Sequence, residues 1–263
     1  MKKNIIKEVL QQGGVSIGTM VFEFDSTGIA RIAAETGAEF VIFDMEHTGW
    51  GEETIRKLMA TTPKSRITPM VRIPDTKYHF TARVLDMGAM GIMVPRVETE
   101  EQAKHIVQCS KYPPLGRRGA AFGIAHDDYQ TGDVVAAMVS ANREQLLIAQ
   151  IETQQGVQNV GEIAAVEGID VLWIGHFDLS ISLGIPGQFD HPQFQEAVEQ
   201  VLEACRTHHK TAGFLASDIA NGRQLLSQGF RILAYGGDLW LYQQALQEGI
   251  STLKKINANK QGD

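Results

Sequence analysis

The chain has 263 residues, of which 43% are hydrophobic, and a formal net charge of −7 at pH 7. This balance predicts a large buried core and argues against nucleic-acid and membrane-surface partners, because both favour clustered Lys and Arg. The two cysteines, Cys109 and Cys205, do not have metal-ligand spacing and are expected to be buried thiols in a reducing compartment. Residues 1–14 are too polar for a signal peptide and no run of about 18 apolar residues occurs, so a cytoplasmic protein is predicted.

Short apolar, β-branched runs alternate with helix-like stretches along the whole chain. Eight of these runs are predicted to be strands: residues 15–20, 40–44, 67–73, 91–95, 146–152, 171–175, 212–216 and 231–236. Eight strand–helix units in about 250 residues are typical of a closed (β/α)8 TIM barrel, here a single α/β domain over residues 1–263. The main alternative, an open doubly wound sheet, is disfavoured because the first strand–helix turn has no G-x-G-x-x-G loop.

One connection, residues 109–135, is unusually long and rich in Pro and Gly. We expect an ordered excursion over a rim of the barrel, since long ordered loops are often functional. A surface insertion without a role is the alternative.

Polar side chains gather where the predicted strands end, which is where barrels of this class place their chemistry. They are Asp44, Glu46 and His47 after the second strand, Arg72 in the third, Gln150 and Glu152 in the fifth, and Asp178 after the sixth. The carboxylates of Glu152 and Asp178, on neighbouring strands, suit a divalent cation such as Mg²⁺ that takes oxygen ligands. The alternative is that each acid caps the helix that follows it.

A lysine for Schiff-base chemistry is absent from all eight predicted strands, and Lys210 precedes the seventh strand, at the wrong end of the barrel. This disfavours covalent imine chemistry and leaves a metal as the electrophile. His47 is then a candidate general base, because imidazoles as a class titrate near neutral pH. Arg72 is a candidate for binding a carboxylate or a developing oxyanion. The alternatives are a surface histidine and a salt bridge across the rim.

Six stretches of the sequence form a more specific pattern: FDMEHTGW, VRIP, GAMGIMVPRVET, KYPPLGRRG, QIETQQGVQN and WIGHFDLSISLG. In this order they resemble the metal-dependent (class II) pyruvate aldolases typified by 4-hydroxy-2-oxoheptanedioate aldolase, whose superfamily includes the citrate lyase β-chain. The resemblance implies a barrel of the phosphoenolpyruvate/pyruvate-binding type. It also implies a carbon–carbon lyase that cleaves or forms 4-hydroxy-2-oxo acids from pyruvate and an aldehyde.

The resemblance implies roles for the matched positions around the metal. Glu152 and Asp178 would hold Mg²⁺, Mn²⁺ or Co²⁺, with pyruvate oxygens as further ligands. Gln150 and the backbone around Phe177 and Asp178 would contact the substrate. The sequence departs from the best-known aldolases at His176 and Phe177, where they have smaller residues or Pro. His176 is either a further polar contact or a packing residue.

The resemblance also implies the proton-transfer and charge-stabilising groups. His47 would be the catalytic base, strengthened by Asp86 from a neighbouring subunit, and Arg72 would stabilise the enolate oxygen. Asp44 matches a further acid of the same motif. The apolar residues between positions 239 and 253 predict an oligomer, and the resemblance implies a hexamer built from two trimers with exchanged C-terminal helices. The alternative is that this segment packs on its own barrel as an ordinary eighth helix.

Two other functions are compatible with the same acid pair. One is a lyase acting on a coenzyme A thioester, or a decarboxylase, for which Arg117 and Arg118 could form a basic docking patch. The other is a barrel that only binds 2-oxo acids, which an intact base, arginine and acid pair disfavour. The sequence does not identify the aldehyde or choose among the three metals, because these ions share oxygen ligands.

Overall fold

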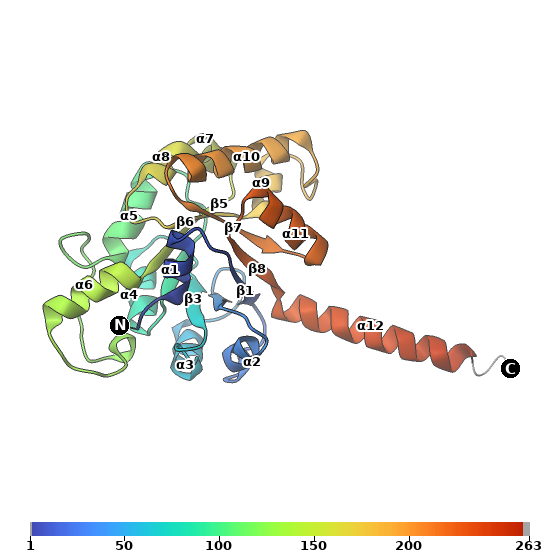
Figure 1. Cartoon of the computed structure of the whole chain (residues 1–263), viewed down its shortest axis with the longest axis horizontal. Coiled ribbons are helices and arrows are strands. Elements are labelled where there is room, and N and C mark those ends of the chain that lie inside the picture. Colours follow the sequence, from blue (N-terminus) through green and yellow to red (C-terminus); the bar gives the residue numbers. More distant parts are fainter. Residues whose placement is uncertain (1, 260–263) are drawn as a thin grey trace.

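Eight parallel strands form a closed barrel in this chain, whose computed structural model describes residues 2–259 (Figure 1). The strands are β1 (Ser16–Val21), β2 (Phe40–Asp44), β3 (Thr68–Arg72), β4 (Gly91–Val94), β5 (Leu146–Ile151), β6 (Val171–Ile174), β7 (Thr211–Ala216) and β8 (Ile232–Gly237). Each strand pairs in parallel with the next, and β8 pairs with β1. The predicted barrel is confirmed, and every predicted strand agrees with the structure to within one residue at each end.

Helices form the outer layer around the strands. They are α1 (Ile5–Gln11), α2 (Ile29–Glu35), α3 (Glu52–Thr61), α4 (Tyr78–Asp86), α5 (Glu100–Ser110), α6 (Val134–Glu144), α7 (Gln154–Gln158), α8 (Val160–Ala165), α9 (His176–Ser182), α10 (Pro192–Thr207), α11 (Ile219–Gln228) and α12 (Asp238–Asn259), with a 3₁₀ turn at Ala125–Asp127. Several begin at residues that suit helix starts. Thr99 and Gln102 form a capping box at α5, and the Asp218 carboxylate caps α11.

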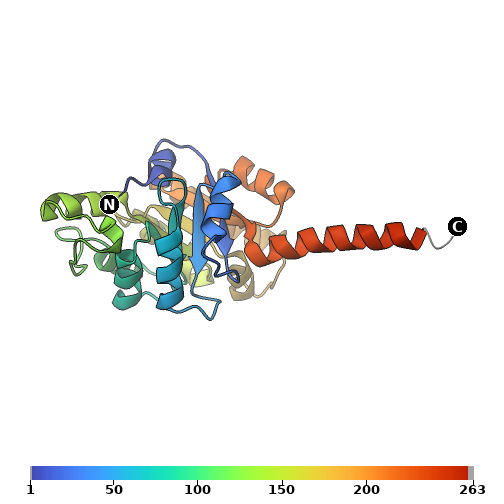
Figure 2. The same cartoon turned by 90° about the horizontal axis from the view of Figure 1, so that it is seen from below.

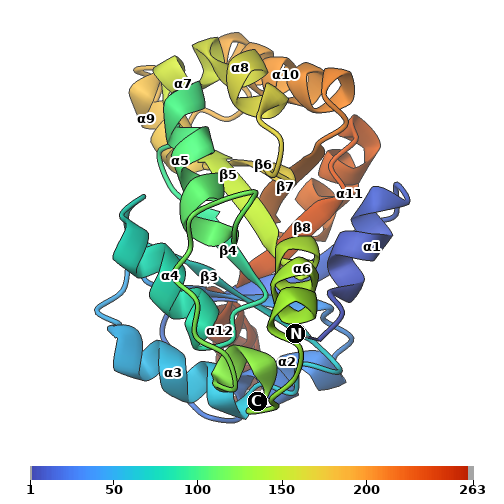
Figure 3. The same cartoon turned by 90° about the vertical axis from the view of Figure 1, so that its left-hand side faces the viewer.

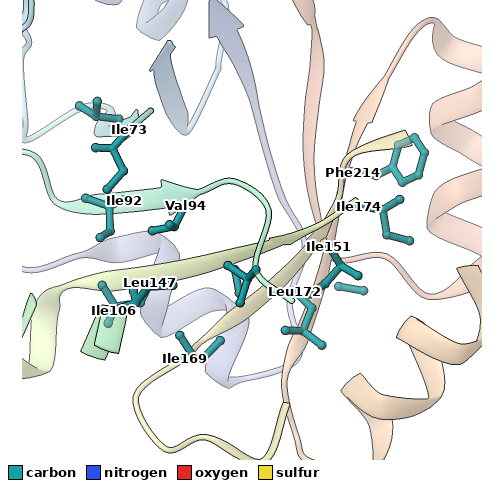
Figure 4. Packing of buried hydrophobic residues seen from close by; sticks show 14 of the residues in the cluster. Ile73, Ile92, Val94, Ile106, Leu147, Ile151, Ile169, Leu172, Ile174 and Phe214 are labelled. Atoms are coloured by element: carbon teal, nitrogen blue, oxygen red, sulfur yellow. The ribbon is translucent and has the colours of Figure 1, made fainter. Parts of the chain in front are cut away.

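Alternate residues of each strand point into the barrel and fill it with side chains. The inner cluster includes Phe40 and Ile42 from β2, Met70 from β3, and Leu146 and Ile148 from β5. The intervening residues face the helices and form a second apolar layer, part of which is seen in Figure 4. Because both faces of each strand are covered, the strands are apolar without alternation, which explains why the sequence predicted them well.

Helix α1 closes the N-terminal end of the barrel. Its Ile6 and Leu10 belong to the inner apolar cluster. The Asn4 side chain fixes the start of the helix by donating to the carbonyl oxygens of Met90 at 3.1 Å and Glu144 at 2.9 Å. The N-terminal ends of the strands are therefore covered, and the large polar cavity lies at the opposite rim.

The long connection between α5 and α6 also lies at the N-terminal end of the barrel. Lys64, which precedes β3, donates from Nζ to the carbonyl of Ala125 at 3.4 Å, and Asp128 pairs with Lys2 at 3.2 Å. The N-terminus and α6 lie on the side of the molecule away from α12 (Figures 1 and 3). Within one chain, this excursion does not cover the rim where the strands end.

The last helix, α12, does not pack along its own barrel. It projects from the body of the molecule for most of its length (Figures 1 and 2), which overturns the alternative that it serves as an ordinary eighth barrel helix. Large apolar side chains are exposed along it: Trp240, Tyr242, Leu246, Ile250, Leu253 and Ile256. Within residues 2–259, no helix is long and apolar enough to cross a membrane.

We expect this exposed helix to mediate assembly, because proteins rarely leave such an apolar stripe exposed to water. Light scattering at micromolar concentration should give a multiple of 28.9 kDa, with six copies as the predicted number. Replacing Leu246 and Leu253 by Glu should lower that mass, whereas the Lys254→Glu control should not. A wild-type monomer at this concentration would contradict the prediction.

Candidate active site

The inward-pointing positions of three strands change from apolar to polar toward the rim where the strands end. On β2 the series Phe40, Ile42 ends in Asp44, and on β3 Met70 is followed by Arg72. On β5 the same alternation leads from Leu146 and Ile148 to Gln150, and then to Glu152 just beyond the strand. The two-residue period of a strand therefore aims all four polar side chains at the same end of the barrel interior.

Asp44 and Arg72 form a buried ion pair across two neighbouring strands. Their Cα atoms are partners in the β2–β3 register, and Arg72 Nε donates to Asp44 Oδ1 at 2.6 Å. The carboxylate also accepts from the backbone N–H groups of Glu46 at 3.1 Å and His47 at 3.0 Å. Asp44 is fully buried and Arg72 is 6% exposed, so the pair holds the guanidinium in one orientation.

Glu46 and His47 continue from β2 into the rim. Glu46 Oε2 lies 3.2 Å from a terminal nitrogen of Arg72 and 3.7 Å from His47 Nε2. Burial raises the pKa of Glu46, and Arg72 and His47 oppose this rise, while the nearby carboxylates of Asp44 and Asp178 add to it. The His47 side chain is 54% exposed, so its imidazole can reach a molecule in the cavity.

The Glu152 side chain is almost fully buried just beyond the end of β5. Its Oε1 accepts from the backbone N–H of Arg96 at 2.7 Å, and its Oε2 accepts from the side-chain amide of Gln150. Burial raises the pKa of Glu152 to about 7, and repulsion from Glu46 and Asp178 adds to the rise. The three carboxylates are therefore close enough to disfavour one another's charge.

Neither metal candidate serves as a helix cap. The cap of α7 is Thr153, whose hydroxyl accepts from Gly156 N–H, and the cap of α9 is Gly175, which has no side chain to cap with. Glu152 precedes the first cap and Asp178 lies in the first turn of α9. The capping alternative for these two acids is wrong, which leaves their carboxylates available to a ligand.

The residues around Glu152 fit a divalent cation. A Cβ at Gly175 would lie 2.3 Å from Glu152 Oε2 and 2.7 Å from Gln150 Nε2, so only glycine leaves this space open. The Gln150 Oε1 atom is buried without a hydrogen-bond partner among the described residues. No group of three or more His, Cys, Asp or Glu side chains within residues 2–259 is arranged to hold a metal. A cation here would therefore take its remaining ligands from substrate oxygens and water.

A cavity of about 690 Å³ opens beside these groups at the rim. Its wall includes the predicted site residues His47, Arg72, Gln150, Phe177 and Asp178. Apolar side chains complete it: Met20, Phe22, Trp50, Trp173, Leu215 and Trp240. The structure thus brings most of the predicted site residues to one pocket of a size suited to a small molecule.

Asp86 does not join this pocket within the chain. It ends α4, toward the N-terminal side of the barrel, where its Oδ1 accepts from Arg118 at 2.5 Å. A role for Asp86 beside His47 thus requires a second copy of the chain and stays a prediction. The eight described strands contain no lysine, and Lys210 donates to the carbonyls of Val166 and Ile169 before β7.

His176 lies among aromatic rings rather than among the polar groups. Its ring stacks on Phe214, with centroids 5.0 Å apart, and lies 5.2 Å from Phe189 and 4.6 Å from Phe177. Burial lowers the pKa of His176 to about 4, which keeps the imidazole neutral near pH 7. The structure therefore favours the packing alternative for this residue.

Two supporting residues were not anticipated from the sequence. Asp238, directly after β8, accepts from the backbone N–H groups of Phe22, Glu23 and Phe24 at 2.7–3.0 Å and holds the β1–α2 loop against the cavity. Arg96 adopts a left-handed backbone with φ of 52°, which points its N–H at Glu152. Asp238 could have been predicted to belong to the site, because it is an acid directly after a predicted strand. No feature of the sequence predicts the left-handed turn at Arg96.

With this site at the strand ends, comparison with known proteins gives the class. Residues 20–245 match the HpcH/HpaI aldolase/citrate lyase family model, so the chain belongs to that family and is a carbon–carbon lyase. A 2-keto-3-deoxy-L-rhamnonate aldolase from Klebsiella pneumoniae is 36% identical over 259 residues, which cover 98% of this chain and 96% of the relative. A Salmonella gallinarum protein of the same name is 34% identical, over 97% of this chain and 95% of its own.

Solved structures agree with the family assignment. An HpcH/HpaI aldolase from Desulfitobacterium hafniense superposes with a TM-score of 0.90 at 33% identity, over 94% of this chain and 96% of that one. The citrate synthase SbnG superposes with a TM-score of 0.85 at 30% identity, over 96% of this chain and 98% of its own. The Klebsiella and Salmonella relatives are both named 2-keto-3-deoxy-L-rhamnonate aldolase, so they do not support the narrower likeness to 4-hydroxy-2-oxoheptanedioate aldolase.

Replacing Asp44 by Ala should destabilise the fold strongly, because it leaves the buried charge of Arg72 without its main partner. We expect the free energy of unfolding to fall by about 3 kcal/mol or more in urea titrations. The control is Glu35→Ala, which removes a solvent-exposed pair with Arg66 and should change the free energy of unfolding far less. Equal effects of the two changes would show that the Asp44–Arg72 pair does not organise the rim.

Proposed function

We propose that this chain is a divalent-metal-dependent aldolase that cleaves 4-hydroxy-2-oxo acids to pyruvate and an aldehyde, or joins these products in reverse. The observation that supports this most is that two kinds of group meet at one rim of the barrel. The crowded carboxylates of Glu152 and Asp178 suit a cation. Asp178 and Arg72, whose guanidinium is fixed by Asp44, line the cavity, and Glu152 is hydrogen-bonded to Gln150 of the cavity wall. A substrate that carries adjacent carboxylate and ketone oxygens matches both.

Glu152 and Asp178 would hold the metal, with Mg²⁺, Mn²⁺ and Co²⁺ as candidates. When bound, such an ion supplies an electrophile for the 2-oxo group of the substrate. Gln150 holds one Glu152 oxygen and has a free amide oxygen beside it, so it is placed to orient both the carboxylate and a substrate hydroxyl or water. The backbone at Phe177 and Asp178, at the start of α9, presents N–H groups to an anionic substrate.

Side chains of the protein would carry out the proton transfer and the stabilisation of negative charge. His47 takes the proton of the 4-hydroxyl group, which lets the C3–C4 bond break and the aldehyde leave. The enolate that remains takes a proton at C3 and becomes pyruvate. Arg72 donates hydrogen bonds to the oxygen on which negative charge develops. Asp44 acts through Arg72 as a positioning residue, and Asp86 of a second copy would orient His47 in the assembled enzyme.

The substrate class follows from the same chemistry. A 2-keto-3-deoxy sugar acid carries a 2-oxo group and a 4-hydroxyl group, so the activity named for the two bacterial relatives falls within the proposed class.

The coenzyme A alternative loses its docking patch. Arg118 is buried, pairs with Asp86 and lies over the Tyr112 ring at 4.7 Å, at the end of the barrel away from the cavity. Arg117 alone stays exposed there. Within one chain, therefore, Arg117 and Arg118 do not form a basic patch beside Glu152.

Metal binding is testable without activity. Mn²⁺ or Mg²⁺ should raise the melting temperature of EDTA-treated protein, because a ligand that binds only the folded state stabilises it. The Glu152→Gln, Asp178→Asn double variant should lose this shift, whereas the exposed Glu199→Gln control should keep it. A full shift in the double variant would place the cation elsewhere.

Arg72 separates catalysis from passive binding of a 2-oxo acid. Arg72→Ala should lower kcat by about 10²–10³-fold while pyruvate affinity falls much less, since the charge that it meets grows only as the bond breaks. Arg72→Lys should recover little, because an ammonium lacks the planar fork. Exchange of the pyruvate methyl protons with D₂O measures this step without an aldehyde, and the surface change Arg83→Ala is the control. Wild-type exchange rates in Arg72→Ala would rule out this role.

A further inference from the structure

A second cavity, of about 370 Å³, lies beside the active-site cavity. It is formed by α9, α10, β7 and α11 and by the first turns of α12. Four side chains line both cavities and thus form their common wall: His176, Phe177, Leu215 and Trp240. The second cavity therefore adjoins the cavity in which the proposed reaction takes place.

The second cavity has a mainly aromatic and aliphatic interior, with a single carboxylate among its polar groups. Phe189 makes edge contacts with Phe177 and Phe194 at centroid distances of 5.2 and 5.5 Å, and Phe214 stacks on His176. Val198 and Leu225 add aliphatic surface. The polar members of its wall are amides and a serine hydroxyl, together with one carboxylate: Asp190, Gln195, Ser217, Asn221, Gln224, Gln228 and Gln244. No lysine or arginine is among the residues that line it.

The wall between the cavities is placed where the aldehyde half of a substrate would lie. Phe177 directly precedes Asp178, a proposed metal ligand, so its ring begins one residue from the reacting centre. Phe177 is 58% exposed and Trp240 is 47% exposed, so neither ring is locked by surrounding atoms. A chain that leaves the reacting carbons in this direction meets these two rings and, behind them, the second cavity.

We propose that this second cavity is a subsite for the neutral aromatic or branched apolar substituent of the aldehyde, with Phe177 and Trp240 at its entrance. The proposal rests on the aldolase function proposed above. The chemistry of the lining decides the class of ligand. Aromatic walls reward the burial of an apolar group, and a single carboxylate without a compensating cation disfavours a second anionic group.

The volume is sufficient for such a group. An apolar cavity of about 150 Å³ is large enough to bind benzene, and this one is more than twice that size. An apolar group bound in a matching pocket is commonly worth about 10-fold or more in discrimination. We therefore expect a measurable preference between aldehydes that differ only in the distant substituent.

The test compares aldehydes in aldol addition to pyruvate, in which C3 of pyruvate joins the aldehyde carbon and the aldehyde oxygen gains a proton. Propanal and 3-phenylpropanal share their reacting end and differ by the phenyl ring, and 4-oxobutanoate replaces the ring by a carboxylate. Gln224→Phe and Gln228→Phe fill the second cavity from α11, and neither residue lines the active-site cavity. The matched control, Arg223→Phe, adds the same ring at an exposed position of α11 that is not in the cavity wall.

Wild-type enzyme should show a kcat/KM about 10-fold or more higher for 3-phenylpropanal than for propanal, with no such preference for 4-oxobutanoate. The two filling variants should remove most of this preference and leave propanal unchanged, while Arg223→Phe retains it. Equal values for the three aldehydes, or a preference that survives both filling variants, would overturn the subsite.

The same experiment distinguishes two other failures. Metal-dependent exchange of pyruvate methyl protons in D₂O does not involve an aldehyde, so its absence would refute the aldolase function itself. If the filling variants change the mass measured by light scattering and leave aldehyde preference intact, the cavity is a contact between copies of the chain, and the subsite is wrong.

Discussion

The two-residue period of strands in a closed barrel is the constraint on which the rest of this structure depends. In β2, β3 and β5 the inward positions are apolar through the middle of the barrel and become polar at the last inward residue. A shift of one residue in any strand would move its polar group into the helix-facing layer, where no partner is available. The β2–β3 register, with Asp44 opposite Arg72, is thus a requirement of packing and of the site together.

The same arrangement creates an electrostatic imbalance that suits a cation. Asp44 has its charge balanced by Arg72, whereas Glu152 is buried near Glu46 and Asp178 and has only hydrogen bonds from Gln150 and an N–H group. Burying a carboxylate near others is unfavourable unless a counter-charge arrives. Gly175 lies beside this unfavourable carboxylate, and any other side chain at that position would fill the space. Both features are accounted for by a bound metal.

The sequence predicted the strands because local composition determines them, and it predicted the rim residues because chain order places strand ends together. In this way the sequence could identify Glu152 and Asp178 as candidate metal ligands. Only the structure excluded a capping role for them, because it shows that Thr153 and Gly175 occupy the cap positions. The direction of α12 could not be predicted, since its apolar residues suit packing on its own barrel as well as on another copy. The sequence also could not predict which end of the barrel residues 111–133 cover, because this depends on long-range contacts such as that between Lys64 and Ala125. The aromatic cavity behind His176 joins residues from β7, α10 and α11, a combination that no local pattern reveals.

The central claim is that Glu152 and Asp178 hold a divalent metal at which a 2-oxo acid is bound. Anomalous diffraction from crystals grown with Mn²⁺ and pyruvate tests this directly. The account predicts a Mn²⁺ peak within about 2.0–2.4 Å of a carboxylate oxygen of both residues, with Arg72 directed at the pyruvate ketone oxygen. Mn²⁺ bound at other residues, with pyruvate in the cavity and these carboxylates free, would contradict it.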